Sequence, residues 1–112
     1  MVETIVRDFI NKYGTVNAYM ERPENAPDTY YLIEKTGSRT ADKLTTSTII
    51  IQSYAKTLYA AAVLNDEIVA LMDTLPDYSK EVAGVHLNTD YNFTDAAAKQ
   101  YRYQAVFTIT HY

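Results

Sequence analysis

The side chains with the widest chemical use in this sequence are its two histidines, His86 and His111. Paired imidazoles can bind a metal ion or transfer protons, and Asp90 adds a carboxylate between them in the sequence. No HExxH, His-x-His or aspartate-rich loop accompanies them, so the motif rules favour two ordinary surface or rim residues. A catalytic cluster of these three residues stays open as an alternative, because it requires only that the fold bring them together.

Other patterns of catalytic or nucleotide-binding proteins are missing. The three glycines stand alone in the sequence, so neither a GxGxxG turn nor a GxxxxGK[ST] phosphate loop can form. The absence of cysteine excludes thiol nucleophiles, disulfides and the common zinc-finger patterns. We therefore expect a protein that is not an enzyme and that uses no cofactor and no metal.

Size and charge restrict the class of protein further. A chain of 112 residues predicts one domain over residues 1–112, and no stretch approaches the roughly 18 apolar residues of a membrane span. The N-terminus lacks the pattern of a secretory signal, so we expect assembly in a cytoplasm. A net charge of −4 with scattered Lys and Arg argues against tight or specific nucleic-acid binding.

Tyrosine is the unusual component, with 11 Tyr against 3 Phe and no Trp. Such rings are apolar on their faces and form hydrogen bonds at their tips, which suits half-buried sheets and protein interfaces. Tyr30, Tyr31, Tyr101 and Tyr103 are expected to cover a sheet through cross-strand pairs, to form contacts between subunits, or to do both.

Two segments have the spacing of amphipathic helices. The first covers residues 2–13 and carries an apolar stripe of Val2, Ile5, Val6, Phe9, Ile10 and Tyr13, with Gly14 as its C-cap. The second covers about residues 55–75 and is ended by Pro76. Its alanines allow close packing on a sheet.

Five segments have the composition of strands: residues 15–21, 29–35, 44–54, 82–93 and 101–112. Residues 36–43 are polar and exceed a two-residue turn, so we expect an exposed, mobile arm there. The last strand alternates cleanly and places Tyr101, Tyr103, Ala105, Phe107, Ile109 and His111 on one face. The prediction is an α+β fold in the order α-β-β-β-α-β-β, with a largely antiparallel sheet and two main helices packed on one face.

This order of elements, together with the closing sequence YRYQAVFTIT at residues 101–110, resembles the tail-terminator, or tail-completion, proteins of long-tailed bacteriophages and prophages. The resemblance spans nearly the whole chain. It implies a non-enzymatic virion protein that forms a ring, a hexamer, on the end of the tail tube and presents the surface that joins the head connector. Its partners would be copies of itself, the major tail tube protein and head–tail connector proteins. DNA would pass through the ring without specific binding.

Within that interpretation, contacts to other subunits or to the tube are expected from Arg39, Asp42 and Lys43 in the arm and from Tyr101 and Tyr103 in the last strand. The alternative interpretation is that the arm is a solvated hairpin tip that makes no contact with a partner. Two further functions stay open: an adaptor or head-closure protein of the same junction, and a small ligand-binding domain that uses the tyrosines as a pocket floor.

Overall fold

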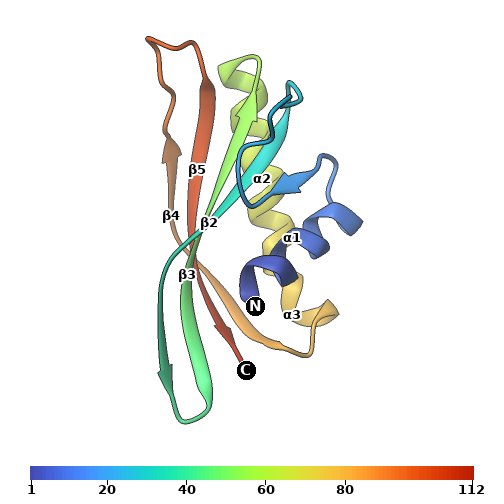
Figure 1. Cartoon of the computed structure of the whole chain (residues 1–112), viewed down its shortest axis with the longest axis vertical. Helices are drawn as coiled ribbons and strands as arrows, with labels where there is room; N and C mark the ends of the chain where they lie inside the picture. Colours follow the sequence, from blue (N-terminus) through green and yellow to red (C-terminus); the bar gives the residue numbers. More distant parts are fainter.

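A computed structural model describes all 112 residues, Met1–Tyr112, as one twisted sheet with its helices on a single face (Figure 1). The elements in chain order are α1 (Val2–Tyr13), β1 (Ala18–Tyr19), β2 (Tyr30–Ala41), β3 (Leu44–Ala55), α2 (Leu58–Asp73), α3 (Leu75–Tyr78), β4 (Val82–Asn92) and β5 (Tyr101–His111). No helix is both long and apolar enough to cross a bilayer.

The sheet has five strands in the order β1-β2-β3-β5-β4. All neighbours are antiparallel except β1 and β2, which run parallel over two residue pairs. The predicted α+β class, with a largely antiparallel sheet and helices on one face, is therefore confirmed, and α3 is added to the predicted order. β4 shifts register between Val82 and Gly84 and again between Leu87 and Thr89.

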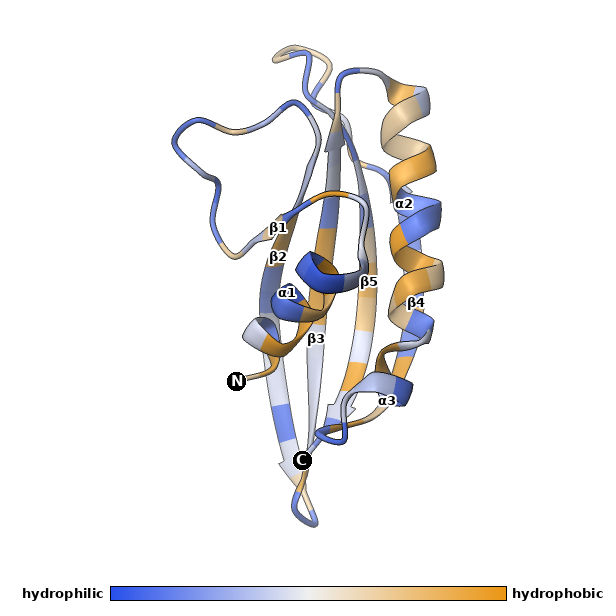
Figure 2. Cartoon of the chain, turned by 90° about the vertical axis from the view of Figure 1, so that its right-hand side faces the viewer, coloured by the Kyte–Doolittle hydropathy of each residue, from blue (hydrophilic) through white to orange (hydrophobic).

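The core lies between the helices and the middle of the two central strands. Strand residues alternate between the faces, so Ala105, Phe107 and Ile109 of β5 all point toward the helices and are fully buried. They belong to one apolar cluster with residues of β3, α1 and α2, among them Ile49, Ile51, Val6, Ile10, Ile68 and Met72. Figure 2 shows this hydrophobic band across the middle of the sheet. The prediction that these three residues share one face of the last strand is therefore confirmed, and that face is the buried one.

Helix α1 has the predicted bounds and ends at its C-cap, Gly14. The glycine does not adopt a left-handed conformation, since its φ is −83°. A Cβ at this position would lie 2.7 Å from the carbonyl oxygen of Ile10, which is closer than real Cβ atoms come. Glycine is needed because the chain passes so close to the last turn of the helix.

Helix α2 is shorter at both ends than residues 55–75. Residue 55 still belongs to β3, and Thr57 caps the helix by accepting a hydrogen bond at Oγ1 from the N–H of Ala60, at 3.1 Å. The helix ends at Asp73, and Pro76 lies in the first turn of the short α3 rather than at the end of α2. Proline is well tolerated there because first-turn N–H groups have no partner within the helix.

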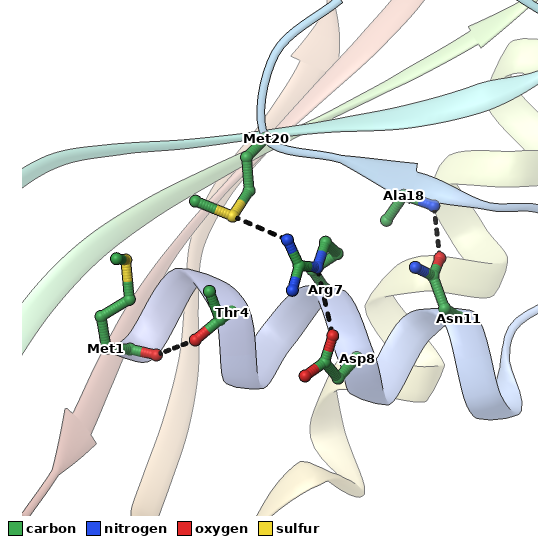
Figure 3. Close-up of polar contacts among 7 residues, drawn as sticks. All are labelled: Met1, Thr4, Arg7, Asp8, Asn11, Ala18 and Met20. Atoms are coloured by element: carbon green, nitrogen blue, oxygen red, sulfur yellow. Dashed lines mark hydrogen bonds and ion pairs between the residues drawn. The ribbon is translucent and has the colours of Figure 1, made fainter. Parts of the chain in front are cut away.

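Only two residues of the predicted strand 15–21 pair as a strand, namely β1. Polar contacts from α1 hold this short segment (Figure 3). Asn11 Oδ1 accepts a hydrogen bond from the N–H of Ala18 at 2.7 Å, and Arg7 reaches the Met20 sulfur at 3.5 Å. The strand is short because this segment bonds to the helix as well as to β2.

Residues 36–43 are exposed, as predicted, but they form a paired strand and a tight turn instead of an irregular arm. β2 continues to Ala41, and a two-residue turn, Asp42-Lys43, leads directly into β3. Both turn residues have positive φ, 52° and 68°, as a type I′ hairpin turn requires. Polar side chains replace apolar packing between the strands: the hydroxyls of Ser38 and Ser47 lie 3.0 Å apart, and those of Thr40 and Thr45 lie 2.9 Å apart.

Candidate functional site

The paired residues 37–48, called the distal hairpin below, extend the sheet beyond the helices (Figure 1). Every residue from Glu34 to Lys43 is exposed. The molecule measures 45 × 25 × 24 Å along its principal axes, so the hairpin forms one end of an elongated body. Arg39, Asp42 and Lys43, predicted as contact residues, lie together at this end.

The last strand supports one side of the distal hairpin. Thr45 pairs with His111 and Thr46 pairs with Thr110, so β5 runs alongside β3 nearly to the turn. The buried hydroxyl of Ser47 lies 2.8 Å from His111 Nε2 and ties the two strands together. The hairpin is thus a continuation of the sheet, which can present its tip in a defined position.

Lys43 adopts a left-handed backbone conformation. This conformation is unfavourable in free energy for any residue with a Cβ, but not for glycine. Lys43→Gly should therefore raise the free energy of unfolding by about 0.5 to 1 kcal/mol. Urea unfolding followed by circular dichroism measures the change. Lys43→Ala removes the same charge but keeps the Cβ, so it should bring no such gain; equal stabilisation by both variants would assign the effect to charge.

Tyr101 and Tyr103, the other predicted contact residues, lie near the opposite end of the sheet. They are half-buried and pair with Ala55 and Ser53 of β3. Seven residue steps along β5 separate Tyr103 from Thr110, which flanks the distal hairpin, or about 23 Å. The structure therefore divides the predicted contact residues between two ends of the molecule.

The tyrosines do cover the sheet, but on different faces. Tyr30 lies on the face opposite the helices and stacks on Tyr54, with ring centroids 4.7 Å apart and an interplanar angle of 3°. Tyr31 is buried under α2, where its hydroxyl donates to the carbonyl oxygen of Leu64 at 3.1 Å. Burial, helped by the negative charge of Glu67, raises the pKa of Tyr31 far above its usual value, so the phenol stays protonated.

The proposed histidine cluster does not assemble. His86 pairs with Thr108, and because Thr108 and His111 are three residues apart on β5, the two imidazoles lie on opposite faces of the sheet. Asp90 pairs with Ala105, six residues or about 20 Å from His111, and its carboxylate accepts a hydrogen bond from Asn65 at 2.7 Å. No group of three or more His, Cys, Asp or Glu side chains lies close enough to hold a metal ion.

Sequence reasoning missed three cations at the tyrosine end, which is the end of the sheet opposite the distal hairpin. Arg22, Lys56 and Lys99 line a common cavity there together with Tyr30 and Tyr54. The three come from the loops before β2, before α2 and before β5, so no local motif joins them. Only the clustering of tyrosines at strand ends points to this region in the sequence.

Both long edges of the sheet lack a neighbouring strand. β1 pairs with β2 only at Tyr31 and Leu32, which leaves residues 33–41 of β2 with one free side. The outer side of β4 is free as well. Free strand edges present unpaired N–H and C=O groups that can bind another chain. No protein-family model matches the chain, and no curated protein matches its sequence.

Proposed function

We propose that this chain is a structural, non-enzymatic subunit that forms a ring on the end of a bacteriophage tail tube and provides the surface that joins the tail to the head. The observation that carries the proposal is the elongated sheet with a free edge on each side and with the predicted contact residues divided between its two ends. The resemblance of the closing strand and of the element order to tail-terminator proteins supplies the phage context.

A ring subunit needs two different side surfaces that bind each other, since only such heterologous contacts close into a ring. The free edges of β2 and β4 lie on opposite sides of the sheet and are suited to this task. The distal hairpin continues the free edge of β2 and extends this contact between subunits. The upper and lower faces of the ring then remain for other partners: the major tail tube protein and a head–tail connector protein. A net charge of −4 lets DNA pass without adhering.

Assembly with the tail tube protein tests this proposal. The full chain, alone and mixed with the major tail tube protein of the same phage, should form rings of about six copies that negative-stain electron microscopy shows at tube ends. Mass photometry over a range of concentrations should give the mass of the same oligomer. A chain that stays monomeric under every condition, including with added tube protein, would overturn the proposal.

An adaptor or head-closure protein of the same head–tail junction is the second candidate, because the two-ended shape serves that role equally well. The two functions differ in their first partner. A terminator should bind the tube protein, whereas an adaptor should bind the portal ring in the absence of tube protein. Pull-down of the chain with each purified partner separates them.

A further inference from the structure

The cavity at the tyrosine end has a volume of about 290 Å³ and an unusual lining. It is lined by three cations, Arg22, Lys56 and Lys99, and by a single carboxylate, Asp28. Arg102 is not part of the lining but donates a hydrogen bond to the hydroxyl of the lining residue Tyr54 at 3.1 Å. Positive charge is therefore concentrated here, in a chain whose net charge is −4.

Two of these three cations, Arg22 and Lys99, have no carboxylate partner within the chain. Arg22 pairs with the neutral amide of Gln100: when the amide oxygen faces the guanidinium, it accepts two hydrogen bonds at 2.9 and 3.1 Å. Lys99 has no ion-pair partner. Lys56 lies 3.1 Å from Asp28, but both side chains are 71% exposed, and such surface pairs are weak and exchange partners readily.

A buried donor in the cavity wall also lacks a partner. Tyr30 is 2% exposed, and its hydroxyl forms no hydrogen bond. Buried polar groups are almost always paired, because an unpaired one has lost its water without compensation. Burial raises the pKa of Tyr30, and the charges of Arg22 and, to a smaller extent, Arg102 oppose that rise, which places both guanidinium groups within electrostatic reach of the phenol.

We propose that this cavity binds the carboxylate side chains of an acidic protein segment supplied by a partner. A carboxylate that enters beside Arg22 can accept the unused hydrogen bond of Tyr30 and replace Gln100 or Asp28 as the counter-charge. A bond from the guanidinium of Arg22 to a carboxylate joins two opposite charges and is stronger than its bond to the uncharged amide of Gln100. The faces of Tyr54 and Tyr101 offer apolar contact to the methylene groups of Glu or Asp.

The lining of the cavity favours a protein segment over a nucleic acid. Its volume of about 290 Å³ is at the small end of the usual range for ligand pockets, about 300 to 1,000 Å³, and has room for one or two carboxylate side chains. A nucleic-acid surface needs cations in a row that follows successive phosphates. Here the three cations line one cavity together with Asp28. Binding at this site requires no ring.

The probe for the test is a hexaglutamate peptide, titrated into the full chain at low ionic strength and followed by amide NMR shifts. Hexaglutamine, inorganic phosphate and a ten-residue oligothymidine serve as comparison ligands. Hexaglutamate should shift the amides around the cavity saturably. The double variant Lys56→Gln/Lys99→Gln should bind about tenfold more weakly, as should Tyr30→Phe.

Arg39→Gln is the matched control, since it removes one exposed cation at the distal hairpin. Its affinity for hexaglutamate should equal that of the parent. Equal weakening by Arg39→Gln, or the absence of saturable shifts at the cavity, would overturn the proposal. Tighter binding of the oligothymidine or of phosphate than of hexaglutamate would overturn it in favour of a phosphate site. If the amide shifts of unbound Tyr30→Phe stay native, the variant is folded, and a weaker affinity then reflects the missing hydroxyl.

Discussion

Replacing Phe107 with alanine is expected to lower the free energy of unfolding by about 3 to 5 kcal/mol. Phe107 is 1% exposed and lies on the helix-facing side of β5, between the two neighbours that β5 has in the sheet. Removal of its ring leaves a cavity that β3, β4 and α2 cannot close without breaking strand pairs. Because domains of this size are stable by only about 5 to 15 kcal/mol, the loss is a large fraction of the total.

Val106, the adjacent residue, provides the control because it points to the opposite, open face of the sheet and is half-buried. Val106→Ala should lower the free energy of unfolding by only about 1 kcal/mol. The substitution removes less buried apolar area than Phe107→Ala does, and it creates no closed cavity. Urea unfolding of both variants, monitored by circular dichroism, compares them directly. Similar losses in the two variants would mean that both faces of the sheet are equally covered, contrary to the one-sided core described above.

The one-sided core is also the part of the fold that the sequence predicts best. Period-two alternation in β5 identifies Ala105 and Ile109 as inward residues, because a strand offers only two faces. In α1, spacings of three and four place Val6 and Ile10 on the buried stripe for the same geometric reason. Both patterns are local, so one segment of sequence contains the whole signal.

Within the distal hairpin, residues 44–48 belong to a correctly predicted strand, but the sequence does not predict the pairing of residues 37–41 or the tight turn. Residues 37–41 lack the alternating apolar residues by which strands are recognised, and Asp42-Lys43 is not the Asn-Gly or Asp-Gly pair that marks a type I′ turn. Pairing is supported by hydroxyl contacts, such as Ser38 with Ser47, and by the neighbouring strand β5. That support comes from residues far away in the sequence.

The candidate sites depend even more on tertiary structure. Arg22 and Lys99 are 77 positions apart in the numbering, and only the return of β5 beside β3 brings their loops to the same end. The register shift between Leu87 and Thr89 changes which residues of β4 face the helices, so Asp90 faces inward although simple alternation from His86 would place it outward. A pattern read along one strand does not reveal such a shift.

Shortening the distal hairpin is expected to abolish ring assembly while leaving a folded monomer. Deleting Thr40 and Ala41 from β2 and Leu44 and Thr45 from β3 removes two residue pairs and retains the Asp42-Lys43 turn on the Arg39–Thr46 pair. An even number of removed pairs keeps the alternation of ladder hydrogen bonds, so the type I′ turn still fits. The tip then lies about 7 Å closer to the body but carries the same charges.

The expected effect on assembly is large because the contact depends on how far the hairpin tip extends from the body. The deleted residues contribute no buried core side chain, so the circular dichroism spectrum and urea midpoint should change little. A contact that depends on the position of the tip is lost completely when the tip falls several ångströms short, because dispersion and hydrogen bonds act only at contact distance.

Mass photometry should therefore show monomer at concentrations where the parent forms rings. Val106→Ala, which leaves the distal hairpin unchanged, should still assemble. If the shortened chain formed rings as readily as the parent, the hairpin would be excluded as the assembly contact, and the free edges of β2 and β4 alone would have to close the ring.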